Sequence, residues 1–447
     1  MSVSHCIDSA RVIAGVPDVM RLHRRSRSNL EGYQSRRLRS LVTHAYERVP
    51  YYRIAFDAHG VHPRDVRSIE DVCALPLTTK KDIQAASHTD LLARGLDLER
   101  LIERRTTGST GQPLRICRTW FEERLLGLFR WRILAALGWR PTDRHVDVEE
   151  PVPQDANDRT IVHRVLQKAG LGRQLRINAF HEPEELLNLL HDAKPNVLTG
   201  YGGVLARVAR VALTAGSETP RPHLIAVHSD TFTRQMRSAI ETGFQAPVYE
   251  IYDANEANVI AWQCKQTHSL HTSDCTTLVE VLVDGRRAQP GERGEVVLTA
   301  LHSYAMPLIR YRIGDLAIQG SQQCDCGLPF STIRAIQGRM FDYFPLADGR
   351  TIHPYEIINV LNEVAPWIME YRVIQQRRDL VRLHFVSQES PSANQVTEMR
   401  HAVGTLLGPQ VEFEEKQVKQ LEFEGSAKLR VCRSMIASEY DCGGDDR

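Results

Sequence analysis

The sequence predicts an α/β protein, with a large domain of layered sheets followed by a smaller α+β domain. Between residues 182 and 242, helical patterns of apolar residues alternate with short apolar strands such as 196–199, which indicates parallel strands covered by helices. From 277 to 299, two strand patterns flank an Asp-Gly turn, which is typical of an antiparallel hairpin. Residues 343–435 mix helical patterns with short strands and form the separate α+β part.

Length and composition agree with this organisation. A chain of 447 residues, 42% hydrophobic and 25% charged, suits one large and one smaller globular domain. The net charge of +1 gives no reason to expect a nucleic-acid partner. No apolar run reaches the ~18 residues that would span a bilayer, and residues 1–12 lack the apolar core of a signal peptide, so we expect a cytoplasmic protein without a membrane partner. The nine cysteines are expected to be reduced thiols or metal ligands.

The N-terminal part is expected to be helical. Apolar residues fall at helical intervals between residues 34 and 56, with an interruption at Pro50, and Thr78 or Thr79 is a candidate cap for the next helix. A cluster of arginines precedes residue 40 and indicates a solvated helix face, with an anion-binding arm as the alternative. The cluster consists of Arg21, Arg24, Arg25, Arg27, Arg36, Arg37 and Arg39.

A hydroxyl-rich, glycine-punctuated turn lies between two apolar segments, at residues 105–113. Glycines let backbone N–H groups approach an anion closely and the hydroxyls add donors, so the turn is a candidate phosphate cradle; an ordinary solvated connection is the alternative. It is not the loop of P-loop NTPases, because Gln112 stands where that loop has lysine. A strand at 114–117 and an apolar helix at 120–137 follow it. The candidate nucleotide contacts of the turn are Thr106, Thr107, Gly108, Ser109, Thr110 and Gly111.

Four further stretches follow in a particular order. They are Ile251-Tyr252-Asp253-Ala254-Asn255-Glu256, Tyr311-Arg312-Ile313-Gly314-Asp315, Gln337-Gly338-Arg339-Met340-Phe341-Asp342 and Gly425-Ser426-Ala427-Lys428-Leu429-Arg430. Together with the turn, they make the chain resemble the adenylate-forming (AMP-binding) enzyme superfamily, and within it the phenylacetate–coenzyme A ligase branch that includes capsule-biosynthesis proteins. The resemblance spans roughly residues 45 to 435.

The resemblance implies a domain organisation and an activity. Residues 1–338 would form the AMP-binding domain, with layered α/β sheets and a small β-barrel lobe, and 339–447 a mobile lid. The enzyme would activate an aromatic or other small carboxylic acid with ATP and Mg²⁺ and pass the acyl group to a thiol, most simply that of coenzyme A. Alternatives are transfer to a carrier-protein thiol, an amine or a sugar hydroxyl, or a catalytically silent nucleotide-binding relative. A homodimer is compatible with the sequence.

The resemblance also assigns roles residue by residue. Glu256 would bind Mg²⁺, Asp315 would hold the ribose hydroxyls, Arg339 would lie near the ribose or phosphates, and Lys428 would bridge the acid and the α-phosphate. Glu256, Arg339 and Lys428 form the expected catalytic set. The remaining expected nucleotide contacts are Ser229, Asp230, Tyr252, Asp253, Ala254 and Asn255. Several positions depart from the family pattern, namely Asp253, Asn255, Phe341 and Ala427. The acid pocket is expected between residues 120 and 260, where Tyr201-Gly202-Gly203 and His228-Ser229-Asp230 precede helices and are expected to face it. His228 would either orient the substrate or satisfy a backbone carbonyl.

A second constellation consists of Cys264, His271, Cys324 and Cys326. Three thiols and one imidazole fit a closed tetrahedral Zn²⁺ site, and the resemblance includes similar Cys/His placements. His268 is an alternative to His271, and four unconnected reduced residues are the alternative to a metal site. Because all four zinc positions would be filled by protein atoms, we expect a structural ion that holds two loops together.

Overall fold

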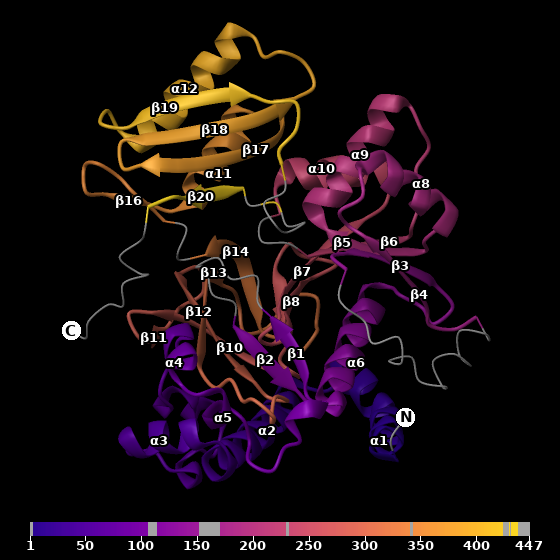
Figure 1. Ribbon diagram of the computed structural model, residues 1–447, viewed down its shortest axis with the longest axis vertical. Coiled ribbons are helices and arrows are strands. Elements are labelled where there is room, and N and C mark those ends of the chain that lie inside the picture. The colour runs from indigo at the N-terminus through magenta and orange to yellow at the C-terminus, as the bar shows by residue number, and fades with distance from the viewer. Residues whose placement is uncertain are drawn as a thin grey trace. The chain divides into compact units, whose positions relative to one another are not determined.

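The computed structural model describes residues 3–105, 114–151, 170–228, 232–339, 343–422, 429 and 431–436. The chain divides into two compact units, which are considered separately (Figure 1). The first unit combines Met1–Gly138 with Ile251–Ile336, and the second combines Trp139–Glu250 with Gln337–Arg447. Each unit therefore contains two stretches that are distant in the sequence.

The N-terminal helices of the first unit begin where the sequence supplies caps. Thr79 accepts a hydrogen bond from the backbone N–H of Asp82, and Pro50 occupies the first turn of its helix, where a missing N–H costs nothing. Thr119 caps the helix that follows the predicted phosphate turn, and Gly138, with φ +119°, ends it. The helices are α1 (Val3–Arg21), α2 (Arg27–Arg48), α3 (Pro50–Ala58), α4 (Lys80–Ala85), α5 (His88–Leu91) and α6 (Trp120–Leu137).

Most strands of the first unit form an antiparallel sheet, which confirms the predicted change to β structure after residue 256. The predicted Asp-Gly turn joins β10 to the short edge strand β11, in which Arg286 is opposite Val283. On its other side β10 pairs with β12, where Glu280 is opposite Val297. The strand order is β11-β10-β12-β13-β14-β9-β8-β7. The members are β7 (Val248–Ala254), β8 (Asn258–Gln263), β9 (Leu270–Thr272), β10 (Thr277–Val283), β11 (Arg286–Arg287), β12 (Arg293–Ala300), β13 (Tyr311–Gln319) and β14 (Thr332–Arg339).

A separate antiparallel pair, β1 (Ile102–Arg105) and β2 (Arg115–Arg118), borders the predicted phosphate turn. Arg105 is paired with Arg115, so the residues that flank this part of the chain on either side lie next to each other. The segment itself, which contains all six candidate phosphate contacts, lies outside the described residues.

The second unit begins with a parallel sheet, as the alternation of strands and helices predicts. Its order is β7-β6-β5-β3-β4, with β3 (Arg144–Glu149), β4 (Arg173–Asn178), β5 (Val197–Tyr201), β6 (Leu224–His228) and the first residues of β7. The helices α8 (Pro183–Ala193), α9 (Gly202–Ala215) and α10 (Arg234–Phe244) pack on one face through a buried apolar core. Strands β5 and β6 are wholly buried, which explains why their sequences are mainly apolar, whereas the edge strand β4 is largely exposed.

The C-terminal part of the second unit has its own four-stranded sheet, in the order β19-β18-β17-β20. Its side chains and those of α8 to α10 belong to one apolar cluster, in which Val204 and Phe244 occur with Ile357 and Leu383. The predicted domain boundary after residue 338 stays a prediction. The elements are β15 (Phe344–Pro345), β16 (Thr351–Ile352), α11 (Pro354–Val364), β17 (Ile368–Arg377), β18 (Leu380–Ser387), α12 (Ala393–Leu407), β19 (Glu412–Gln417) and β20 (Cys432–Ser434). Within the described ranges, no helix has the length and apolar character needed to cross a membrane.

Candidate functional site

Two of the motifs meet in the first unit. Tyr252 is near the end of β7, and its hydroxyl donates a hydrogen bond to the carboxylate of Asp315 on β13. Both residues are buried, and Asp315 is 9% exposed to solvent. Directly before Asp315, Gly314 has a φ of +83°, a left-handed backbone conformation that favours glycine. The structure therefore brings together two stretches that are about 60 residues apart, at the position where the resemblance expects the ribose.

The turn after β7 also contacts the strands that border the predicted phosphate turn. Asn255 Nδ2 donates to the backbone carbonyl of Arg105 at 2.8 Å, and the buried guanidinium of Arg118 donates to the carbonyl of Asn255. These contacts join the 252–256 stretch to β1 and β2. The departure at Asn255 thus has a structural consequence, since its side-chain amide N–H donates to this carbonyl of β1.

Arg118 is a residue that the sequence did not single out. It also approaches Glu123 of α6 at 3.2 Å, and Arg104 of β1 approaches the other oxygen of the same carboxylate at 2.5 Å. Burial alone would raise the pKa of Glu123, but the two guanidiniums outweigh it and hold that pKa below its ordinary value. The ionised carboxylate therefore fixes both arginines beside the turn.

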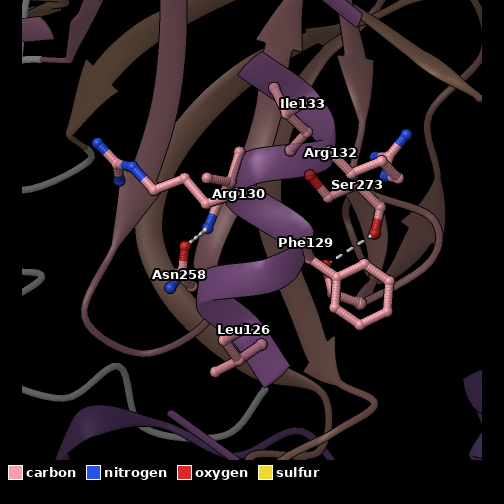
Figure 2. A pocket seen from close by; sticks show the side chains of 9 residues that line it. Leu126, Phe129, Arg130, Arg132, Ile133, Asn258 and Ser273 are labelled. Carbon is pink, nitrogen blue, oxygen red and sulfur yellow. Dashed lines mark hydrogen bonds between the residues drawn. The ribbon is translucent and has the colours of Figure 1, made fainter. Parts of the chain in front are cut away.

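Asp253, which replaces a glycine of the family pattern, is paired with α6. Arg130 Nη1 donates to Asp253 Oδ2 at 2.8 Å, and both side chains are about three-quarters buried. Figure 2 shows Arg130 on α6 near Asn258, at the rim of a small pocket that also involves Phe129 and Arg132. This pocket has no room for a water molecule, so it is a packing gap and not a ligand site.

The other predicted catalytic residues are described only in part. Glu256 lies between β7 and β8 and is 9% exposed. Arg339 is the last residue of β14, and its side chain is outside the description. Lys428, Ser229 and Asp230 lie outside the described residues. Their roles, like those of the other candidate contacts, stay predictions.

The cysteine and histidine constellation is assembled in the first unit. One ligand atom from each of Cys264, His271, Cys324 and Cys326 lies within 4.8 Å of the others. Cys264 follows β8 and His271 belongs to β9, so both come from one hairpin, while the Cys-x-Cys pair follows β13. This is the predicted arrangement of the two loops. The group contains His271 and not the alternative His268.

The distances within this group suit a tetrahedral ion. The sulfurs of Cys264 and Cys324 are 3.8 Å apart, and Cys326 Sγ is 3.4 Å from His271 Nε2. Two thiolates that each lie ~2.3 Å from a tetrahedral zinc are separated by ~3.8 Å. A disulfide, with sulfurs ~2.05 Å apart, is excluded for this pair. Backbone N–H of Gln266 also donates to Cys264 Sγ at 3.3 Å, a contact that favours the thiolate.

His271 is in the protonation state that a metal ligand needs. Burial and the nearby Arg132 lower the pKa of His271 to about 4, so its imidazole is neutral at pH 7. Its ring lies 4.7 Å from that of Trp262 and 6.0 Å from that of Phe330, and these aromatic groups restrict its orientation. Nε2 faces the sulfur of Cys326.

A second polar cluster lies in the second unit, at the carboxyl ends of the parallel strands. Ligand atoms of Asp147 and Glu149 on β3 and of His228 on β6 lie within 4.8 Å of one another. Thr199 Oγ1 on β5 donates to Asp147 Oδ1 at 2.5 Å, and His228 Nε2 is 3.4 Å from Glu149 Oε1. The chain runs from β3 to β4 on one side of β3 and then to β5 on its other side, so the sheet has a topological switch point between β3 and β5. Open α/β sheets bind ligands at such points. His228 was expected to face the acid pocket; its two acidic neighbours were not predicted.

Comparison with known proteins agrees with the motifs. No family model matches the chain. The chain is similar to "Phenylacetate-coenzyme A ligase" of Thermus thermophilus, with 26% identity over 78% of this chain and 79% of the relative. The enzyme of the same name from Escherichia coli is 29% identical over 64% of this chain and 66% of its own length. "Protein CapK" of Staphylococcus aureus is 24% identical over 59% of each chain.

Solved structures show the same fold. A crystal structure of 2-hydroxyisobutyryl-CoA ligase in the postadenylation state superimposes with a TM-score of 0.75 and 21% identity, covering 94% of this chain and 92% of that one. An anthranilate CoA ligase in complex with anthranoyl-AMP has a TM-score of 0.55 and 13% identity, covering 75% and 67%. The five motifs, their order and these similarities agree: the chain resembles the adenylate-forming superfamily, and within it the phenylacetate–coenzyme A ligases and CapK.

Proposed function

We propose that the protein is an ATP-dependent acid–thiol ligase that activates a small carboxylic acid as an acyl-adenylate and transfers the acyl group to coenzyme A. The observation that carries this proposal is the convergence of Tyr252 with Asp315 and of Asn255 with the strand that enters the predicted phosphate turn. The names of the relatives support it, because they are coenzyme A ligases, and so does the solved relative that holds an acyl-adenylate.

The chemistry has two steps. A carboxylate oxygen attacks the α-phosphorus of ATP, the bond to pyrophosphate breaks, and an acyl-adenylate forms. The sulfur of coenzyme A then attacks the acyl carbon, and AMP leaves with the bonding electrons. Buried Glu256 is a suitable ligand for Mg²⁺, which neutralises phosphate charge when bound. Asp315 would hold the ribose, while Lys428 and Arg339 would stabilise charge on the α-phosphate and the acid.

Finer parts of the proposal concern the acceptor, the assembly and the location. A carrier-protein thiol, an amine or a sugar hydroxyl would replace coenzyme A if the chain resembles CapK in function more than the ligases. We further propose a cytoplasmic location, since ATP and coenzyme A are both available there. We also propose that the protein forms a homodimer, which a measurement of its molecular mass in solution would test.

We also propose that Cys264, His271, Cys324 and Cys326 hold a structural Zn²⁺. The short S–S and S–N separations, the neutral imidazole and the position of the ligands on two loops support it. A closed site of this kind contributes folding energy, and with all four positions filled by protein it leaves no place for a substrate.

The Asp315→Ala variant is expected to raise the KM for ATP by about 30- to 100-fold. A carboxylate that accepts from two ribose hydroxyls contributes roughly 2–3 kcal/mol of binding, and the substitution also leaves the Tyr252 hydroxyl without its acceptor. Tyr252→Phe removes only the hydroxyl and should have a smaller effect in the same direction. Initial rates against ATP concentration measure both, with the exposed Asp97→Ala as the control. An unchanged KM in Asp315→Ala would exclude the ribose role.

Acid-dependent release of pyrophosphate from ATP tests the proposal. The panel should contain aryl, arylacetic, fatty, hydroxy and amino acids, each with and without coenzyme A. Release that needs an acid and increases with coenzyme A supports the ligase. Release that ignores coenzyme A points to another acceptor, and the absence of release with every acid favours a catalytically silent relative.

A further inference from the structure

A buried arginine of the first unit has no ion-pair partner among the described residues. Arg132 is on α6 and is 2% exposed. Its Nε and Nη1 atoms are buried and donate to no atom in the part of the chain that the structure describes. Figure 2 shows Arg132 on the side of α6 opposite Arg130, next to the packing gap, where no water molecule fits. A buried charge of this kind destabilises a protein unless another group compensates it.

The neighbouring titratable groups compensate Arg132 only in part. Cys275, Asp274 and Tyr33 act electrostatically on its guanidinium. Burial raises the pKa of Cys275 to about 11 and the pKa of Tyr33 to about 12, so both groups are uncharged at pH 7. Of the three, this leaves the carboxylate of Asp274 as the compensating charge.

The carboxylate of Asp274 is bound by other groups. Arg27 Nη1 and the backbone N–H of Ser331 each donate to Oδ2 at 2.8 Å, and the hydroxyl of Thr272 donates to Oδ1. Asp274 therefore has an ion-pair partner of its own in Arg27. Burial lowers the pKa of Arg132 in spite of Asp274, which shows that the positive charge is not fully compensated.

The cysteine and histidine constellation lies beside this charge. Arg132 Cζ is 5.0 Å from the centre of the Phe330 ring, and the centre of the His271 ring is 6.0 Å from the same point. Burial and, after it, the charge of Arg132 lower the pKa of His271, so the field of the guanidinium reaches the constellation. With Zn²⁺ bound, three thiolates and one neutral imidazole would give the group a single net negative charge.

We propose that Arg132 is the buried counter-charge of the zinc group formed by Cys264, His271, Cys324 and Cys326. This proposal rests on the structural zinc site proposed above. An anionic metal group and a guanidinium are each unfavourable in the protein interior, and each stabilises the other there because their attraction is weakly screened. Arg132 is therefore expected to strengthen zinc binding and to destabilise the protein from which zinc has been removed. A residue that served packing alone would stabilise both forms.

Two substitutions in the full-length protein test the sign of this coupling. Arg132→Met replaces the charge with an apolar chain, and Arg132→Lys keeps a positive charge. In competition with a chromophoric zinc chelator, Arg132→Met should bind zinc at least about tenfold more weakly than wild type, and Arg132→Lys should recover most of the loss. The thermal midpoint of Arg132→Met should be below that of wild type with zinc, and equal to it or above it after zinc removal. The exposed Arg36→Met on α2 is the control and should match wild type in both measurements.

The outcomes separate this proposal from the zinc site itself. Wild-type protein that binds no zinc contradicts the zinc site before any variant is compared. If wild type binds zinc and Arg132→Met binds it equally well, only the counter-charge is overturned. Equal weakening in Arg132→Met and Arg132→Lys also overturns it, because the charge would then have no effect. A midpoint of Arg132→Met that falls equally with and without zinc, or a loss of folding in both forms, assigns Arg132 to packing and overturns it as well.

Discussion

Replacement of Lys428 by alanine is expected to slow acid-dependent pyrophosphate release by about 1,000-fold and to leave ATP binding nearly unchanged. A lysine ammonium placed between the acid and the α-phosphate acts on charge that develops in the transition state, so its loss affects kcat and not ground-state binding. A factor of this size corresponds to roughly 4 kcal/mol of transition-state stabilisation. Thioester formation from supplied acyl-adenylate does not involve this charge and should be retained.

The control is the exposed Lys419→Ala, in the same part of the chain. ATP affinity can be measured by equilibrium binding, and pyrophosphate release by a coupled assay with the most active acid of the panel. If Lys428→Ala releases pyrophosphate as fast as wild type, Lys428 has no role in adenylation and is an ordinary surface lysine. If both variants are as inert as wild type with every acid, the silent relative becomes the better explanation.

Loss of the proposed zinc is the second large effect. Cys324→Ser is expected to abolish stoichiometric zinc and to lower the thermal midpoint by about 10 °C or more, since structural zinc sites contribute on the order of 10 kcal/mol of apparent binding energy to folding. Cys324 is buried and its sulfur lies 3.8 Å from that of Cys264. The ion would hold this loop to the β8–β9 hairpin.

Elemental analysis of the purified protein, with thermal unfolding before and after chelation, measures both consequences. Wild type should carry about one zinc per chain. Exposed Cys73→Ser serves as the control and should retain the metal and the midpoint. A wild-type protein without metal, whose stability is the same as that of Cys324→Ser, would reduce the group to four neighbouring thiol and imidazole side chains.

Local signals in the sequence predicted most helices and strands. Helix α6 begins after the Thr119 capping box and ends at Gly138. Both ends of the helix can be predicted from these residues alone, because the caps are local features of the sequence. The Cys/His spacing predicted a four-residue group, because a hairpin and a tight Cys-x-Cys turn each bring two ligands close together. Within the described residues, the structure supplied the choice of His271 over His268, since only the strand register decides which imidazole faces the sulfurs.

Contacts between distant residues could not be predicted in this way. Arg207 and Glu370 are 163 residues apart, and Arg118 lies 137 residues from Asn255. In the sequence each is one of many charged or polar residues, and the pairing exists only after the strands and helices have packed. The same applies to the division into units, in which residues 139–250 share one apolar core with the C-terminal part. A motif in the sequence shows which residue types are present, whereas the contacts between distant residues depend on how the strands and helices pack.

The path of a carboxylate oxygen tests the central claim most directly. The most active acid, labelled with oxygen-18 in its carboxylate, is incubated with ATP, Mg²⁺, coenzyme A and the enzyme, and AMP is examined by mass spectrometry. Attack of the carboxylate on the α-phosphorus predicts AMP that carries one labelled oxygen, formed together with the acyl thioester. Unlabelled AMP, or ADP with labelled phosphate, would contradict an acyl-adenylate and with it the proposed function.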